Sequence, residues 1–338
     1  MAYIEVENLC KEFKVVRRDK GLKSVVKSLF HREYDTVKAV DDISFTVNRG
    51  ELVGYIGPNG AGKSTTIKML TGILVPTSGR ITVDRLTPHL HRKENARRIG
   101  VVFGQRSSLE WDLPMEETFD LFQKIYRIDD AVYKRNVDFY VELLEMGSFL
   151  KRPVRQLSLG EKMRAEIAVA LLHDPEILFL DEPTIGLDVV AKGNIRQFIK
   201  QVNAEKKVTV MLTTHDMDDI EQICHRIIMI DRGIILYNGS LQGFKDKYGG
   251  EYTVTVVFAD DQPVTAVDSR LKLILDEGKR KIYTAQRSVV ETAEALRYFI
   301  DNYQVSYLNI NEAKIEDIVA NAYKKSLMNE DYGVKSTR

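Results

Sequence analysis

"GPNGAGKST" at residues 57–65 decides the fold class of this chain. It matches G-x-x-x-x-G-K-[ST], and it lies between the apolar run "ELVGYI", which predicts a buried strand, and a predicted helix. Gly57, Gly60 and Gly62 are expected to allow turns with positive φ that bring backbone N–H groups around phosphate oxygens. Lys63 is expected to reach the β- and γ-phosphates, and Ser64 to give a hydroxyl to Mg²⁺. A glycine turn before a packed helix is the alternative, but the strand–loop–helix context favours a nucleotide-binding α/β core.

A second stretch, "ILFLDEP" at 177–183, places two acids at the end of a predicted strand. Its four apolar residues indicate a strand buried on both faces, and α/β sheets bind ligands at the carboxyl ends of such strands. We expect Asp181 to hold Mg²⁺ through water and Glu182 to orient and deprotonate an attacking water. Neighbouring strand residues point in opposite directions, so Pro183 is expected to bend the chain and let both acids face the nucleotide.

The composition is that of an ordinary soluble globular protein, with 44% apolar and 29% charged residues among 338, a length that suggests two domains. A formal net charge of zero gives no overall attraction to nucleic acid or lipid. The longest apolar runs fall far short of the roughly 18 residues that span a bilayer. Cys10 and Cys224 are too few for a disulfide framework, and "MAYIEVENLCKEF" lacks an export signal. We therefore expect a cytosolic chain that serves a membrane only through partners.

The pattern along the chain changes several times. Residues 3–16 and 40–56 alternate as strands do, and the segment "VVRRDKGLKSVVKSLFHREYDT" separates them. Its apolar residues recur at helical spacing among basic ones, at Leu22, Val25, Val26, Leu29 and Phe30. From about 109 to 173 the pattern is helical. After "YGGEY", a small α+β domain is predicted from strands at 252–258, 281–285 and 305–310 and helices at 289–303 and 315–323.

Five motifs in order, "GPNGAGKST", "VVFGQ", "LSLGE", "ILFLDEPTIGLD" and "MLTTHD", make residues 3–245 resemble the ATP-binding cassette (ABC) ATPases. The resemblance implies a RecA-like P-loop NTPase core with an antiparallel β subdomain and a helical insert. We accordingly expect a cassette at 1–246, with a basic insert at 17–35 and a helical subdomain at 106–172, and an accessory α+β domain at 247–338. It also implies ATP and Mg²⁺ as cofactors, held between two cassettes that dock head to tail.

The resemblance assigns roles residue by residue. Gln105 matches the glutamine that touches Mg²⁺ and the attacking water, and His215 matches the histidine that bridges the γ-phosphate and Glu182. Phe13 matches the aromatic that stacks on adenine, with Tyr34 as the alternative. The expected catalytic residues are Glu182, His215 and Gln105, and the expected metal ligands are Ser64, Gln105 and Asp181. The expected nucleotide-binding residues are Phe13, Gly57, Asn59, Gly60, Ala61, Gly62, Lys63, Ser64, Thr65, Ser158, Gly160 and Asp188.

The signature segment departs from the family pattern. It commonly reads L-S-G-G-Q, whereas this chain has Leu159 and Glu161 in place of glycine and glutamine. Ser158 and Gly160 match the residues whose hydroxyl and amides face a γ-phosphate across the dimer, and Asp188 matches the aspartate that links the two sites. A carboxylate at 161 suits the helix dipole but would repel that phosphate, so we expect Glu161 to face away from it.

Three kinds of ABC protein are considered. A chromosome-maintenance ATPase needs a long heptad-patterned insert that is absent between Lys63 and Ser158, and ribosome-acting members usually carry two cassettes, whereas one phosphate loop is found. We therefore expect the ATPase subunit of an exporter, partnered by a second copy or close paralogue and by integral membrane permeases. It would lie peripherally at the cytoplasmic face of the membrane, without nucleic acid. Residues 17–32 fit either an element at the membrane interface or a packed helix with a solvated basic face.

Overall fold

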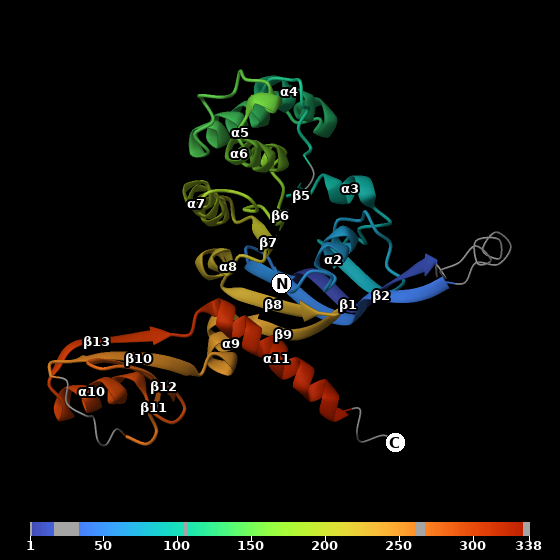
Figure 1. Cartoon of the computed structure of the whole chain (residues 1–338). Helices are drawn as coiled ribbons and strands as arrows, with labels where there is room; N and C mark the ends of the chain where they lie inside the picture. The colour runs from blue at the N-terminus through green and yellow to red at the C-terminus, as the bar shows by residue number, and fades with distance from the viewer. Residues whose placement is uncertain (1, 17–33, 105–106, 261–267, 334–338) are drawn as a thin grey trace, which may run out of the picture. The chain divides into compact units, whose positions relative to one another are not determined.

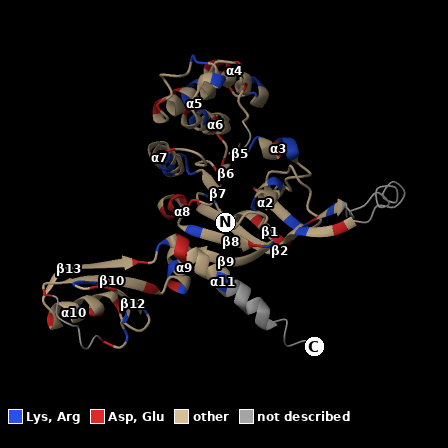
Figure 2. Ribbon diagram, viewed as in Figure 1, with Lys and Arg blue, Asp and Glu red and all other residues tan. Residues whose placement is uncertain are grey.

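The computed structural model describes residues 2–16, 34–104, 107–260 and 268–333, and the chain forms two compact units, Met1–Gly239 and Ser240–Arg338 (Figure 1). The basic insert expected at 17–35, with its five apolar positions, lies outside the described residues except for its last part, which is strand. Basic and acidic side chains are interspersed along the elements of both units (Figure 2), in keeping with the net charge of zero.

The centre of the first unit is a six-stranded sheet of order β5-β6-β7-β3-β8-β9. The five strands from β5 to β8 in this order run parallel to one another. Every residue of β3 and β7 is buried, as expected for parallel strands covered on both faces. The bounds are β3 Leu52–Ile56, β5 Ile99–Phe103, β6 Ile177–Asp181, β7 Thr209–Thr213, β8 Arg226–Asp231 and β9 Ile234–Ser240. The helices α2 Lys63–Leu70, α3 Arg92–Ala96, α7 Val189–Lys206 and α8 Met217–Ile223 accompany this sheet.

An antiparallel sheet of order β2-β1-β4 adjoins this core, with β1 Ala2–Val16, β2 Tyr34–Asn48 and β4 Ser78–Val83. The sequence predicted one alternating stretch at 40–56, but the structure divides it between β2 and β3. The second strand also begins earlier than expected, because Tyr34 pairs with Val16, the last residue of β1. The ends of the apparent insert therefore belong to the sheet.

Three helices form a separate layer of the first unit: α4 Met115–Tyr126, α5 Asp130–Leu143 and α6 Leu159–Leu171, with a 3-10 turn η1 at Val154–Gln156 (Figure 1). They lie within the stretch for which a helical subdomain was predicted. His173, just after α6, stacks its ring on Tyr126 of α4 with the centroids 4.0 Å apart, and its Nε2 donates a hydrogen bond to the Ile99 carbonyl oxygen, 3.1 Å away. Since Ile99 begins β5, this histidine connects the helical layer to the sheet.

The second unit begins at Ser240 rather than at 247, because Ser240 is the N-cap of α9 (Leu241–Tyr248) and α9 packs against α11 (Ile315–Gly333). Its antiparallel sheet has the order β11-β12-β10-β13. The bounds are β10 Glu251–Phe258, β11 Lys272–Glu277, β12 Arg280–Gln286 and β13 Val305–Glu312. The helix α10 (Thr292–Asn302) places Phe299 in a core with Val254 and Tyr283.

The strand β11 was not predicted from the sequence. All six of its residues are exposed and three apolar residues follow one another, so the strand has none of the alternation that marks a half-buried strand. Among the residues that the structure describes, none of the helices combines the length and apolar character needed to cross a membrane.

Candidate functional site

A cavity of about 460 Å³ opens where the phosphate loop meets the carboxyl ends of the central strands. The loop 58–65 forms one wall, and Phe103 and Gly104 after β5 contribute to another. Asp181 and Glu182 come from the end of β6, and His215 from the segment after β7. Five of the predicted site residues therefore share one cavity, at the edge where parallel sheets bind ligands: Lys63, Ser64, Asp181, Glu182 and His215.

Two glycines of the phosphate loop are needed for different reasons. Gly62 has φ of 106° and caps α2, a left-handed conformation that favours glycine. Gly57 was also expected to have a positive φ, and that expectation is wrong. A Cβ at Gly57 would instead lie 2.4 Å from the Ile230 carbonyl oxygen, so the requirement is close packing of the loop against β8.

The ammonium group of Lys63 lies inside the loop. It donates to the carbonyl oxygens of Gly57 at 2.6 Å and Pro58 at 3.2 Å. Burial lowers the pKa of Lys63, and the nearby carboxylates of Glu182 and Asp181 oppose that shift. A bound phosphate chain would give this ammonium charged partners in place of two carbonyls.

Ser64 and Asp181 form an oxygen-only donor set beside the loop. The Ser64 hydroxyl donates to Asp181 Oδ2 at 3.1 Å, and the Thr213 hydroxyl donates to Oδ1 of the same carboxylate. Magnesium is bound in proteins by one or two carboxylates together with hydroxyl, water and phosphate oxygens. Ser64 and Asp181 fit that ion, whereas Gln105, the third expected ligand, lies outside the described residues.

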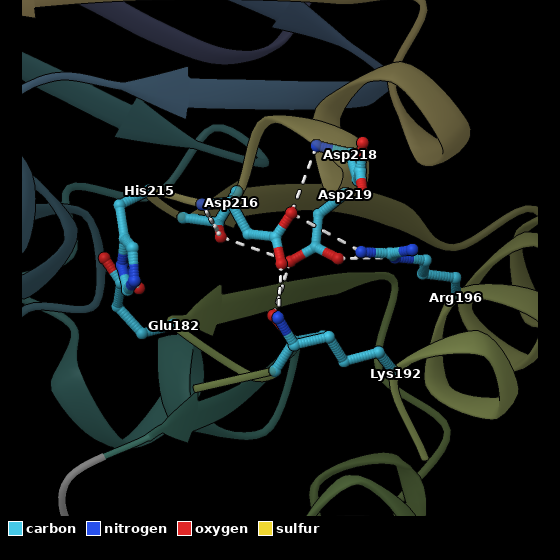
Figure 3. Close-up of polar contacts among 9 residues, drawn as sticks. Glu182, Lys192, Arg196, His215, Asp216, Asp218 and Asp219 are labelled. Atoms are coloured by element: carbon cyan, nitrogen blue, oxygen red, sulfur yellow. Dashed lines mark hydrogen bonds and ion pairs between the residues drawn. The ribbon is translucent and has the colours of Figure 1, made fainter. Parts of the chain in front are cut away.

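Glu182 and His215 face each other at the mouth of the cavity, with Nδ1 of the histidine 2.6 Å from Oε2 of the glutamate (Figure 3). Pro183 was expected to make the bend that turns both acids toward the nucleotide, but the bend lies at Glu182 itself. Its φ is 59°, a left-handed value that interrupts the alternation of the strand, and its N–H donates to the Thr213 carbonyl. Asp181 and Glu182 therefore line the same cavity although they are neighbours in sequence.

The expected signature residues lie at another place in the chain. Ser158, Gly160 and Asp188 line a second cavity of about 310 Å³ that shares no lining residue with the first. Ser158 is the N-cap of α6, and Asp188 is the N-cap of α7, accepting from the Ala191 N–H at 2.9 Å. The residues predicted to bind nucleotide are thus divided between two separate cavities of one chain.

Glu161 also lines the second cavity, but its carboxylate is engaged locally. It forms a capping box with Ser158, accepting from the Ser158 N–H at 2.8 Å while the Ser158 hydroxyl accepts from the Glu161 N–H at 3.2 Å. Its other oxygen pairs with Arg152. Burial raises the pKa of Glu161, yet the hydrogen bonds from Ser158 and Arg152 outweigh it and hold that pKa below its usual value.

The structure does not bring the proposed adenine-stacking residues to the first cavity. Phe13 and Tyr34 lie on β1 and β2, are 38% and 51% exposed, and do not line it. The Lys11 ammonium lies 5.2 Å from the centre of the Phe13 ring. Of β2, the cavity lining includes Ala39.

Sequence reasoning missed Glu166, a buried acid on α6. Its carboxylate accepts from the Ser108 N–H at 2.8 Å and from the hydroxyls of Ser107 and Ser108. It therefore holds the segment directly after Gln105 against the helix that the signature begins. The sequence indicated that Glu166 is buried, since it adjoins Met163 and Ile167 on the apolar face of the predicted helix.

Comparison with known proteins agrees with this geometry. The model of the ABC transporter family matches residues 40–185. ABC transporter ATP-binding protein NatA of Bacillus subtilis (strain 168) is 35% identical over 222 residues, which are 66% of this chain and 90% of that protein. Nod factor export ATP-binding protein I of Ralstonia nicotianae is 33% identical over 234 residues, covering 69% and 71%. The dimeric structure of a post-hydrolysis state of the ATP-binding cassette MJ0796 bound to ADP and Pi aligns with a TM-score of 0.58 and 26% identity, covering 70% of this chain and 98% of that one. The predicted fold class is confirmed.

Proposed function

The chain belongs to the ATP-binding cassette family of transporter ATPases, and we propose that it works as half of a head-to-tail dimer that drives export through separate permease subunits. ATP hydrolysis is the activity of the family, and the first cavity holds the residue types that this reaction needs.

The observation that carries the dimer is the division of the nucleotide-binding residues between two cavities. Lys63 and Ser64 line an open cavity, so a γ-phosphate held there still has one side uncovered. The start of α6, with Ser158 and Gly160, offers N–H groups and the positive end of a helix, which attract anions. Two copies related by a twofold axis can place each signature over the phosphate loop of the other, completing two sites.

Hydrolysis follows from the groups in the first cavity. Glu182 takes a proton from the attacking water, the water oxygen bonds to the γ-phosphorus, and the bond to the ADP oxygen breaks. His215, with Nδ1 2.6 Å from that carboxylate, fixes the orientation of the Glu182 side chain. It also lines the cavity, where it can donate to the γ-phosphate. Lys63 balances charge on the phosphates, and Ser64 and Asp181 are the residues that would hold Mg²⁺. The ion, when bound, neutralises charge that develops on the phosphate oxygens.

Export, rather than another use of ATP, is supported by the Nod factor export protein among the relatives and by the single phosphate loop of this chain. The permease subunits would recognise the substrate and hold the cassettes at the cytoplasmic face of the membrane. The unit from Ser240 onward is proposed to be accessory or regulatory. Action on ribosomes without transport is the alternative, and fractionation of the chain with membranes or with ribosomes separates the two.

A complementation experiment tests the composite site. Lys63→Ala disables the phosphate loop and Ser158→Arg disables the signature, so each variant alone should lose nearly all ATPase activity. In an equimolar mixture about half of the dimers pair the two variants, and each of these holds one intact site. Activity should therefore rise to about a quarter of the wild-type value.

The matched control is a mixture of Lys63→Ala with Ser64→Ala, in which both sites of every dimer carry a defective phosphate loop. This mixture should recover nothing. If Lys63→Ala and Ser158→Arg together give no more than the average of the two alone, the signature of one copy does not serve the phosphate loop of the other.

A further inference from the structure

Asp219 on α8 is a fully buried carboxylate that contacts three different segments of the first unit (Figure 3). Its Oδ1 accepts from Nε of Arg196 on α7 at 2.5 Å. Its Oδ2 accepts from the hydroxyl of Thr184 and, at 3.2 Å, from the hydroxyl of Thr214. Arg196 is itself buried, so this is an ion pair removed from water with both carboxylate oxygens satisfied.

The two threonines belong to the segments that carry the hydrolytic pair. Thr184 follows Glu182 by two residues, and Thr214 directly precedes His215. A single carboxylate therefore binds both segments, and the hydrogen bond between Glu182 and His215 depends on where these segments lie.

A second acid extends the same arrangement. Asp216, directly after His215, pairs with Lys192 and lies 3.5 Å from Nη2 of Arg196, and its N–H donates to the Thr214 hydroxyl at 2.9 Å (Figure 3). Lys192 and Arg196 are four residues apart on one face of α7, so one helix face pairs with both acids that follow His215.

The backbone conformation at Glu182 also requires neighbouring segments to stabilise it. Its left-handed conformation, with φ of 59°, is uncommon for a residue other than glycine and persists only where the surrounding structure holds it. The Thr184 hydroxyl bond to Asp219 lies on the exit side of that turn, and the Glu182 N–H bond to Thr213 lies on the entry side.

The same helix also leads to the second cavity. Asp188, which caps α7, lies one turn before Lys192 and lines the second cavity together with Ser158. The helix that pairs with Asp216 and Asp219 therefore begins at a residue that we propose faces the second copy.

We propose that Asp219 and Arg196 are positioning residues for ATP hydrolysis. Their buried pair fixes the positions of Glu182 and His215 relative to each other and to the start of α7. This inference rests on the proposed function, because it takes Glu182 and His215 as the hydrolytic pair. Neither Asp219 nor Arg196 lines the first cavity, so both act through the residues they hold.

The test measures kcat and KM for ATP in Thr184→Val, Asp219→Asn, Arg196→Gln and Arg196→Lys, with folding followed by circular dichroism. Thr184→Val removes one hydroxyl bond and keeps the ion pair, so it should fold and should lower kcat by about tenfold or more. Its KM should stay within about twofold, because Lys63 and the phosphate loop are untouched. Arg196→Lys should recover part of the kcat that Arg196→Gln loses, because it restores the charge.

Arg135→Gln is the matched control, since it breaks an exposed ion pair with Asp174 outside both cavities and should keep the wild-type kcat. A merely structural role would lower the melting temperature and leave kcat per folded molecule unchanged. Wild-type kcat in folded Thr184→Val overturns the proposal even if Asp219→Asn fails to fold. If the wild-type chain hydrolyses no ATP, or Glu182→Gln hydrolyses it at the wild-type rate, the proposed function fails and this inference fails with it.

Discussion

Replacing Glu161 by glutamine removes one negative charge from the start of α6 and keeps an oxygen that can accept from the Ser158 N–H. The carboxylate accepts from that N–H at 2.8 Å and pairs with Arg152, although it lines the cavity that we propose faces a second copy's ATP. The substitution therefore tests whether the carboxylate is neutralised by its local partners or repels the γ-phosphate.

The two possibilities differ in magnitude. Two negative charges about 6 Å apart at an effective dielectric constant near 20 repel each other by about 3 kcal/mol, so removing one would tighten ATP binding about 100-fold. With Arg152 beside the carboxylate, we expect a change of no more than about twofold. The free energy of unfolding should fall by about 0.2–1 kcal/mol, the usual worth of a partly exposed ion pair. Glu161→Ala, which also loses the capping box, should cost about 1 kcal/mol more.

Calorimetric titration with ATP in a Glu182→Gln background, where turnover is blocked, measures the affinity, and urea unfolding measures the stability. Glu161→Ala serves as the comparison, because it separates the loss of the cap from the loss of charge. A tightening of ATP binding by more than about tenfold in Glu161→Gln would refute the reasoning, since only a carboxylate directed at the nucleotide predicts it.

Three further predictions concern other features of the first unit. Glu166→Ala leaves the Ser108 N–H and two hydroxyls without their acceptor, so it should lower the free energy of unfolding by about 1–3 kcal/mol in urea titration, and an unchanged midpoint would contradict this contact. Gly57→Ala places a methyl group 2.4 Å from the Ile230 carbonyl oxygen, so it should weaken ATP binding at least about tenfold, and unchanged affinity would show that the loop can move aside. Burial lowers the pKa of His173 to about 4 from 6.5, so the unfolded chain takes up a proton first and stability is lost as pH falls from about 6.5 toward 4. His173→Phe should remove up to about 3 kcal/mol of this loss in the free energy of unfolding. The urea midpoint should then depend less on pH, and a pH dependence equal to that of the wild type would contradict the prediction.

Much of the candidate site could be predicted because its chemistry is encoded over short spans. The phosphate loop and the acids ending β6 each follow from a strand, a turn and a few fixed residue types, and these lie in one cavity. The capping box of Ser158 and Glu161 was also readable, since Ser-x-x-Glu before an apolar helix is its pattern.

Other features could not be predicted because they depend on tertiary packing. The close approach of Gly57 to Ile230 requires the placement of β8 beside β3. The pairing of Asp219 with Arg196 joins two helices whose relative placement follows from the order of the parallel strands. The strand β11 is exposed throughout, so no burial pattern marked it.

Glu182 is proposed to be the base of a site that a second copy completes, and ATP-dependent dimerisation of Glu182→Gln tests both parts of this proposal together. Glu182→Gln keeps the shape of the side chain and removes its ability to accept a proton, so this variant should bind ATP, lose turnover and elute as a dimer in light-scattering chromatography with ATP. The double variant Glu182→Gln with Ser158→Arg should remain monomeric under the same conditions, because its signature cannot cover the phosphate. A Glu182→Gln chain that hydrolyses ATP at the wild-type rate, or stays monomeric with ATP bound, would contradict the account.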